Sequence, residues 1–256
     1  MMITIKSPRE IDLMRQAGKI TAAARSLGRS MIRPGVTTEE IDKAINQFIR
    51  SQGATPTFLN YGGFPKSVCL SVNNEVIHGI PGGRVIREGD IVSLDVGATY
   101  KGFVGDCAGT YPAGEVSEEA KRLMEVTRQS FFEGIQFARA GGRLYDISGA
   151  IQQYVESKGY SIVRDYVGHG IGSALHESPE VPNYVPDRAK RQPNVRLLPG
   201  MTLAIEPMVN AGGYGVKVLG DNWTVITADG SLSAHYENTI LITNGEPEIL
   251  TIADDI

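Results

Sequence analysis

Apolar residues recur with the spacing of an amphipathic helix in two segments that lie 106 positions apart. In residues 34–53 and 140–159 they fall at i, i+4, i+7 and i+8, which places them on one helical face. A glycine follows the last turn of each segment, as is usual where helices end. The apolar sets are Ile41, Ile45, Phe48 and Ile49 in the first segment and Ile147, Ile151, Tyr154 and Val155 in the second.

The two segments are also similar residue by residue, which indicates an internal repeat. Residues 89–95 and 200–206 are similar too, since each run passes from a turn glycine through strand residues to an acid. Chance similarity between amphipathic helices is the weaker explanation. We therefore expect a single domain over residues 1–256, in which segments 8–110 and 115–245 repeat. The identical pairs in the helical segments are Gly35/Gly141, Ile41/Ile147, Ala44/Ala150, Ile45/Ile151, Gln47/Gln153, Ser51/Ser157 and Gly53/Gly159.

Capping signals predict one further helix at the start of each half. Ser7 and Glu10 have the spacing of a capping box around Pro8, and Ser117 precedes two glutamates. The apolar stripe of the first of these helices is Leu13, Ala17, Ile20, Ala24 and Leu27.

Runs of β-branched and apolar residues predict strands in residues 67–76, 91–110, 201–209 and 223–243. The last run is expected to fold back at Asp229-Gly230, a typical hairpin turn. Helices and hairpin strands that segregate in this way predict an α+β fold with an antiparallel sheet.

Two acids face each other in the predicted hairpin of residues 91–110. A turn at Tyr100 and Lys101 sets Asp95 directly opposite Asp106, with Cβ atoms ~5 Å apart. A turn one residue later makes the two acids diagonal neighbours on the same face. In either register two carboxylates on an apolar hairpin repel each other, and burial increases the repulsion. A shared proton or a metal cation between them would relieve it.

Composition excludes several classes of protein. A net charge of −4 and a pI near 5.6 argue against nucleic acid as the main partner. The only two cysteines, Cys69 and Cys107, exclude a disulfide framework and suit a reducing cytosol. No apolar run approaches the ~20 residues of a membrane span. We expect a cytoplasmic protein.

Three further residues have the chemistry of metal ligands. His169 is framed by glycines, and Glu206 and Glu237 each interrupt an apolar strand pattern. Taken singly, a loop histidine is more often structural, and a strand glutamate more often pairs with arginine or faces water. Together with Asp95 and Asp106 they form a set that a pair of divalent cations would satisfy.

In order, spacing and local context, these five residues resemble the metal ligands of the methionine aminopeptidases, which have the pita-bread fold. The resemblance covers essentially the whole chain. The short interval between Glu206 and Glu237, with no zinc-finger extension before Ser7, is similar to the bacterial-style type I enzymes. The matching contexts are residues 93–97, 105–106, 168–170, 205–207 and 236–237.

The resemblance implies a hydrolase that removes the initiator methionine from nascent proteins when the second residue is small. It implies two divalent ions, of Co, Mn, Fe or Zn, with Asp106 and Glu237 bridging them. Asp95 would complete one site, and His169 and Glu206 the other. Such ions lower the pKa of water, and their identity follows availability as much as geometry.

Catalytic and specificity roles follow from the same resemblance. Glu206 would act as acid and base, His176 would donate to the developing oxyanion, and His78 would contact the scissile amide nitrogen. Without the resemblance both histidines would be taken as core residues. The implied methionine pocket consists of Phe58, Tyr61, Phe64, Cys69, Leu175 and Trp223, because aromatic walls suit a thioether.

The chain departs from the common type I pattern at four positions. Asn238 replaces a frequent histidine, His235 a frequent glutamine, and Phe58 and Phe64 replace residues often seen as cysteine and tyrosine. These departures bear on the pocket and on groups around the metal ligands.

Three alternatives remain. A prolyl aminopeptidase or dipeptidase uses the same five ligands, but usually after an additional N-terminal domain. A non-catalytic binding protein or a metal-independent creatinase-type hydrolase would lack ligands that are present here. The expected substrates are N-terminal methionyl peptides and nascent chains. We also expect transient ribosome association, a monomer, and no DNA or membrane partner.

Overall fold

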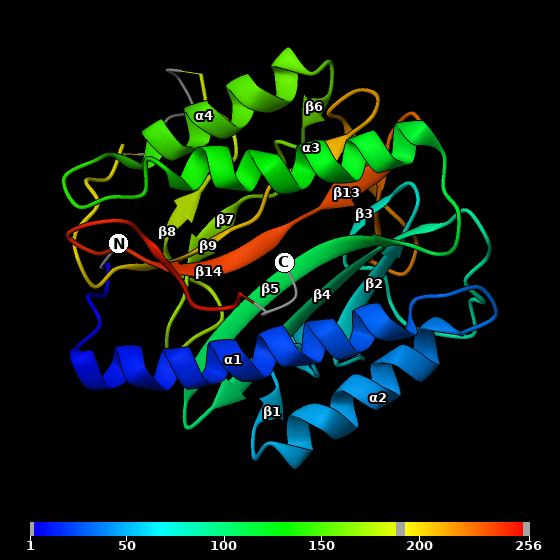
Figure 1. Cartoon of the computed structure of the whole chain (residues 1–256), viewed down its shortest axis with the longest axis horizontal. Coiled ribbons are helices and arrows are strands. Elements are labelled where there is room, and N and C mark those ends of the chain that lie inside the picture. Colours follow the sequence, from blue (N-terminus) through cyan, green and yellow to red (C-terminus); the bar gives the residue numbers. More distant parts are fainter. Residues whose placement is uncertain (1–2, 188–192, 253–256) are drawn as a thin grey trace.

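The computed structural model describes residues 3–187 and 193–252, and its helices form two pairs that flank a central sheet (Figure 1). Helix α1 contacts α2 at one side, and α3 contacts α4 at the other. The helices are α1 (Pro8–Met31), α2 (Thr38–Ser51), α3 (Glu118–Ile135) and α4 (Leu144–Ser157), with a 3₁₀ turn at Tyr61–Gly63. The strands are β1 (Thr55–Pro56), β2 (Val68–Val72), β3 (Glu75–Ile77), β4 (Ile91–Tyr100), β5 (Phe103–Pro112), β6 (Ser161–Ile162), β7 (Gly168–Gly170), β8 (Glu177–Val181), β9 (Thr202–Ile205), β10 (Met208–Asn210), β11 (Val216–Val218), β12 (Val225–Thr227), β13 (Ser233–His235), β14 (Glu237–Leu241) and β15 (Glu248–Ile249).

The helix starts agree with the capping signals. Ser7 and Glu10 form both bonds of the capping box at α1, and Ser117 caps α3. Both ends of α4 lie 106 positions beyond those of α2. The predicted stripe on α1 is only partly right, because Leu13, Ile20 and Leu27 are half-buried. Small residues bring the helix close to the sheet, so the buried face is rotated relative to the predicted stripe. It includes Met14, Ala17, Gly18, Thr21, Ala24, Arg25 and Gly28.

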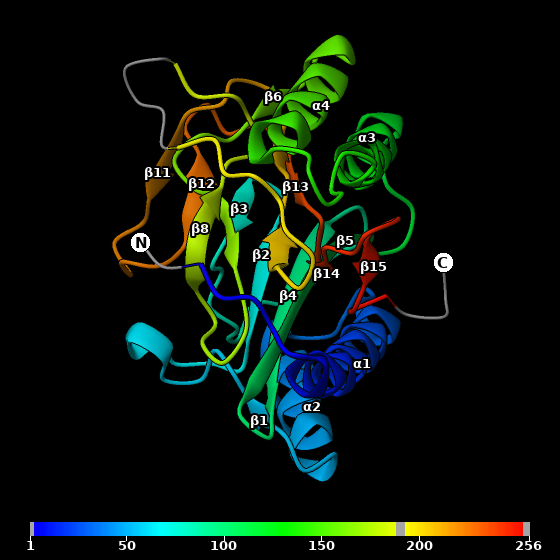
Figure 2. The ribbon, with the colours of Figure 1, turned by 90° about the vertical axis from the view of Figure 1, so that its left-hand side faces the viewer.

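The central sheet runs in the order β1-β4-β5-β14-β9-β7-β8, with β2 also paired to β4 and β15 to β14. Every pairing is antiparallel, and the middle strands β5 and β14 are flanked by β4 and β9. Smaller sheets, β13-β10-β6 and β11-β12-β3, lie beside it (Figure 2).

The expected hairpin at Asp229-Gly230 is wrong. The chain turns there, but β12 pairs with β11 and β3, whereas β13 pairs with β10. The Asp229 carboxylate accepts hydrogen bonds from the main-chain N–H groups of Gly213 and Ser231. The turn is therefore tied to the loop before β11, and the two strands that leave it enter different sheets.

The β4–β5 hairpin adopts the second of the two expected registers. Tyr100 pairs with Phe103, so the loop is Lys101-Gly102, and the turn at Tyr100-Lys101 is wrong. Both loop residues have positive φ, 47° at Lys101 and 83° at Gly102, which the twist of a two-residue hairpin demands. Glycine tolerates this conformation at the second position, where the other register would have placed lysine.

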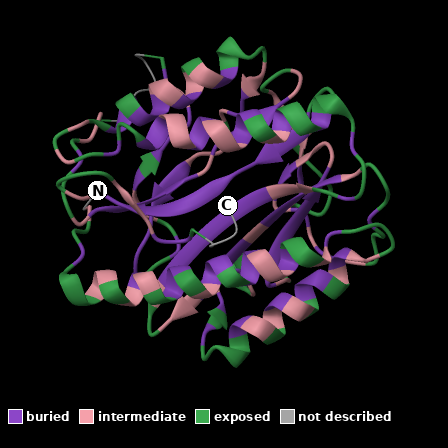
Figure 3. Cartoon of the chain, in the orientation of Figure 1, coloured by how far each residue is buried: buried purple, intermediate pink, exposed green. Residues whose placement is uncertain are grey.

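Two apolar clusters lie under the two helix pairs, and the strands between them are almost wholly buried (Figure 3). Phe131, Ile147 and Ile151 represent the cluster beneath α3 and α4, and Ile41 and Ile45 the cluster beneath α1 and α2. In the described part of the chain, no helix has the length and apolar character needed to cross a membrane.

Gly18 sets the distance between α1 and the strands beneath it. A Cβ at this position would collide with the main-chain oxygen of Leu250, and a Cβ at Gly105 of β5 would in turn collide with the main chain of Gly18. We expect Gly18→Ala to lower the free energy of unfolding by ~1–3 kcal/mol, because backbone atoms must move. Urea denaturation measures this loss. Lys19→Ala on the exposed side of α1 is the control, expected to change stability by less than ~0.5 kcal/mol; equal effects would contradict the packing argument.

Candidate metal centre

Five predicted ligands come together because the strand register places them on one face of the sheet. Asp95 of β4 and Glu237 of β14 both lie opposite Ala108 of β5, whose small side chain leaves space between them. Asp106 lies two residues away on β5 and so shares that face. Strands β7 and β9 continue the row on the other side of β14.

His169 and Glu206 complete the cluster from the far side. Nε2 of His169 is 3.5 Å from Oε1 of Glu206 and 3.9 Å from Oδ2 of Asp106. Asp106, His169 and Glu237, all buried, each offer one donor atom within 4.8 Å of the others. The sequence pattern placed Glu206 within a strand. In the structure it follows Ile205, the last residue of β9.

Within residues 3–187 and 193–252, no lysine or arginine forms an ion pair with any of the four carboxylates. Burial, followed by the charges of the neighbouring acids, raises the pKa of Asp106 and Glu237 well above the ordinary range. Burial and the charge of Asp95 do the same to the pKa of Glu206, and burial raises the pKa of Asp95 to about 7. Oδ1 of Asp95, Oδ1 of Asp106 and Oε1 of Glu237 are buried without a hydrogen-bond partner among the described residues.

His169 presents a lone pair to this cluster. Its Nδ1 lies 2.9 Å from the main-chain oxygen of Gly170, which can only accept, so Nδ1 carries the proton. Burial, with a further contribution from His176, lowers the pKa of His169 to about 4, and the ring is neutral at pH 7. A neutral imidazole with its Nδ1–H bound to a carbonyl is the usual state of a metal-ligating histidine.

The cluster forms the floor of a cavity of about 220 Å³. Every site residue predicted from the sequence lines this cavity, so tertiary structure brings the whole predicted set together. These residues are Phe58, Tyr61, Phe64, Cys69, His78, Asp95, Asp106, His169, Leu175, His176, Glu206, Trp223 and Glu237.

The cavity walls are apolar beside Asp95. Phe64 packs edge-on against Trp223, with ring centroids 5.2 Å apart. Cys69 of β2 lies directly opposite Asp95, so its thiol faces the cavity, and burial raises its pKa well above the usual value. Cys107 belongs instead to the apolar cluster beneath α1 and α2. Both thiols are free.

Two further histidines lie at the cavity. Nδ1 of His176 is 2.7 Å from the hydroxyl of Tyr61, and the His176 ring centroid is 4.3 Å from that of His169. His78 follows β3 with a φ of 59°, a left-handed conformation that is rare outside glycine. Burial lowers the pKa of His78 to about 4, so this ring is neutral as well.

The sequence did not identify all of the lining residues. Gly62, Ile77, Tyr166 and Val167 also face the cavity. Ile77 immediately precedes His78, and Tyr166-Val167 immediately precedes Gly168-His169. This adjacency to predicted site residues is the one feature of the sequence that could have identified them. His235, noted only as a departure from the family pattern, lies with its Nε2 3.9 Å from Glu206 and 4.0 Å from Glu237.

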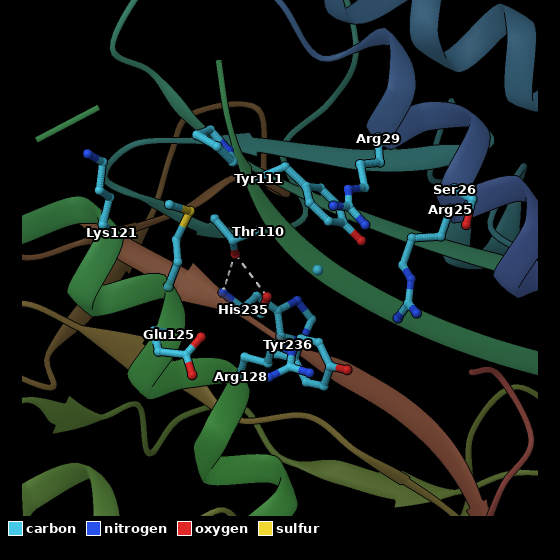
Figure 4. Close-up of a pocket in the computed structure, with 13 residues that line it drawn as sticks. Arg25, Ser26, Arg29, Thr110, Tyr111, Lys121, Glu125, Arg128, His235 and Tyr236 are labelled. Atoms are coloured by element: carbon cyan, nitrogen blue, oxygen red, sulfur yellow. Dashed lines mark hydrogen bonds between the residues drawn. The ribbon is translucent and has the colours of Figure 1, made fainter. Parts of the chain in front are cut away.

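A second cavity, of about 440 Å³, lies between α1 and α3 (Figure 4). Arg25 extends from α1 at this cavity and donates hydrogen bonds to the main-chain oxygens of Ala108 and Glu237 and to Oδ1 of Asn238. This arginine therefore supports the main chain of the strand that carries Glu237.

The sequence pattern of metallopeptidase family M24 matches residues 12–244. The chain belongs to this family. Within it, a methionine aminopeptidase of Clostridium perfringens is 55% identical over 98% of this chain and 99% of that protein. Methionine aminopeptidase 1 of Bacillus subtilis is 52% identical over 98% of this chain and 99% of its own length. The predicted membership of the methionine aminopeptidases is thus confirmed.

Solved structures of M24 relatives confirm the predicted α+β pita-bread fold. A methionine aminopeptidase of Thermotoga maritima, 47% identical, superposes with a TM-score of 0.94. The match covers 98% of this chain and 100% of that one. An Xaa-Pro dipeptidase of Bacillus anthracis, 26% identical, has a TM-score of 0.76, and this chain covers only 63% of it. The M24 fold is therefore shared with the prolidase alternative.

The donor set of this M24 chain fits the divalent metal ions that a metallopeptidase requires. Carboxylates and one neutral imidazole are ligands that Mn, Fe, Co and Zn accept. The unpartnered carboxylate oxygens belong to residues on one face of the sheet, where positive charge would relieve their repulsion. The presence of all five ligands argues against a non-catalytic binding protein and against a metal-independent hydrolase, both of which would lack some of them.

Proposed function

We propose that this protein is a dinuclear metal-dependent aminopeptidase that removes the N-terminal methionine from polypeptides whose second residue is small. The observation that carries the proposal is the convergence of four carboxylates and one neutral imidazole at the floor of an apolar cavity. Identity of 55% over nearly the full length of a methionine aminopeptidase supports it.

Two divalent ions would be held by the five ligands named above, Asp95, Asp106, His169, Glu206 and Glu237. When bound, such ions lower the pKa of water and polarise the carbonyl of the first peptide bond. Four carboxylates suit a pair of dications, because their charges then balance. Co, Mn, Fe and Zn all remain candidates for the physiological metal.

Three residues of the chain handle protons and developing charge. Glu206, at the edge of the cluster, accepts the proton of the attacking water and returns it to the leaving amine. His176 donates from Nε2 to the oxygen of the tetrahedral intermediate, since the Tyr61 hydroxyl can donate to its Nδ1. His78, neutral and held at the cavity wall, contacts the scissile amide nitrogen.

The methionine side chain would enter the apolar part of the cavity. The aromatic rings of Phe58, Phe64 and Trp223 and the thiol of Cys69 border it, and Tyr61 and Leu175 complete the wall. Aromatic rings and sulfur favour a flexible thioether over a charged or branched side chain. The small cavity, about 220 Å³, leaves no room for a long peptide segment before the scissile bond.

The same proposal extends to the surroundings of the enzyme. It takes residues 1–256 as one catalytic domain with repeats at 8–110 and 115–245, supported by the matching bounds of α2 and α4. It places the enzyme in the cytoplasm, which two free cysteines favour, and takes it to be a monomer. Nascent chains would be its substrates, with transient association at the ribosome.

Initial-rate hydrolysis of Met-Gly-Met-Met and Ala-Pro-Ala tests the proposal. Metal-free protein is titrated with Mn²⁺, Fe²⁺, Co²⁺ or Zn²⁺, and we expect metal-dependent release of methionine only. Asp165→Asn, which removes an exposed carboxylate outside the cavity, is the control and should retain full activity. Cleavage of the proline peptide alone would move the protein to the prolidase group; no turnover with any metal would refute enzymatic activity.

A further inference from the structure

His235 is a buried imidazole with an unused nitrogen beside the metal centre. It lies on β13 with 2% of its surface exposed, and its Nε2 has no hydrogen-bond partner among the described residues. This nitrogen is 3.9 Å from Oε2 of Glu206 and 4.0 Å from Oε2 of Glu237. A buried polar atom without a partner is destabilising, which points to an interaction that forms in another state of the site.

Main-chain hydrogen bonds hold His235 in place. The Thr110 hydroxyl accepts from the main-chain N–H of His235 at 2.8 Å and donates to its main-chain oxygen at 2.9 Å (Figure 4). Its strand pairs with β10, where Met208 lies opposite. The ring is therefore delivered to the carboxylates by a fixed main chain, and a substitution of the ring leaves that anchoring unchanged.

The two oxygens of Glu206 face different histidines. Oε1 is 3.5 Å from Nε2 of His169, a predicted metal ligand, whereas Oε2 is directed to His235. The Glu206 side chain is 13% exposed and the Glu237 side chain 3%, and Glu206 lies outside the strands. Of the two acids, Glu206 is therefore the one whose orientation the strands determine least.

We propose that His235 is a positioning residue whose Nε2–H donates a hydrogen bond to Oε2 of Glu206, leaving Oε1 for the metal centre. The inference rests on the proposed function. A shift of about 1 Å brings the two atoms to a normal distance of ~2.9 Å.

Isothermal titration of metal-free protein with Mn²⁺ tests the assignment through metal affinity. Loss of a group that orients a ligand typically weakens metal binding by ~10–100-fold, and we expect this from His235→Ala. His235→Gln, whose side-chain amide can donate from a similar reach, should recover most of the affinity. Ser233→Ala, on the same strand and bonded to Asn210 instead, is the matched control and should bind as the wild type does.

Two results would overturn the assignment. Unchanged Mn²⁺ affinity in His235→Ala would show that the imidazole does not act on the centre. Equal losses in the alanine and glutamine variants, with an altered visible spectrum of the Co²⁺ forms, would show direct coordination instead of positioning. Wild-type protein that binds Mn²⁺ but releases no methionine would refute the proposed function and leave the His235 assignment intact.

Discussion

We expect Asp106→Asn to abolish methionine release at every metal concentration. Asp106 lies at the middle of the cluster, 3.9 Å from His169 and on the same face as Asp95 and Glu237. An amide keeps the volume but supplies one neutral oxygen, so the charge that holds the ions falls. The loss should exceed the ~10²–10³-fold that follows removal of a single oxyanion donor. Initial rates and Mn²⁺ titration calorimetry measure the two effects; wild-type affinity in this variant would contradict the metal centre.

The same substitution should raise the melting temperature of the metal-free protein. The pKa of Asp106 is well above its ordinary range in the folded state, so the folded protein retains a proton that the unfolded chain releases. The raised carboxylates therefore lower the stability of the metal-free wild type as the pH rises toward about 7, the pKa of Asp95. The buried neutral histidines, His78 and His169, act in the opposite sense only below their ordinary pKa of 6.5, so the decline is expected above that pH. At pH ~8 Asp106→Asn removes part of this penalty, and each kcal/mol gained raises the midpoint by ~2–4 °C.

Differential scanning calorimetry between about pH 6 and pH 8 separates this effect from general acid sensitivity. The metal-free wild type should lose stability across this interval, and Asp106→Asn should lose less. With metal bound the dependence reverses, because ligands must be ionised to bind. A metal-free wild type that is as stable as the variant at the higher pH would show that the carboxylates do not repel each other.

We expect His176→Ala to lower kcat by ~10²-fold while Mn²⁺ affinity stays near that of the wild type. The ring is oriented by the Tyr61 hydroxyl, 2.7 Å from Nδ1, which leaves Nε2–H for the substrate. Tyr61→Phe removes only the hydrogen bond that orients the ring, so its decrease in kcat should be smaller, ~10-fold.

His78→Ala should also lower kcat by ~10²-fold. Near-wild-type turnover in both histidine variants would refute their roles, and steady-state kinetics decides.

The residues of the cavity differ in how far the sequence alone could predict that they come together. Asp95 and Asp106 could be recognised as a pair because a hairpin with period-two alternation puts both on one face in either register. His169, Glu206 and Glu237 are distant in the chain, and only their resemblance to a known ligand set linked them. The methionine pocket depended on that resemblance as well, since aromatic residues are usually ordinary core.

By itself, the sequence determined the capped helices, the repeated amphipathic pattern, the α+β class and the shared face of Asp95 and Asp106, because these follow from local spacing and composition. Only the tertiary structure decided the hairpin loop at Lys101-Gly102 and the separation of β12 from β13. It also decided the approach of His235 to Glu206. Such features depend on which strands pair and in what register, and pairing between distant segments is set by the packing of the whole chain.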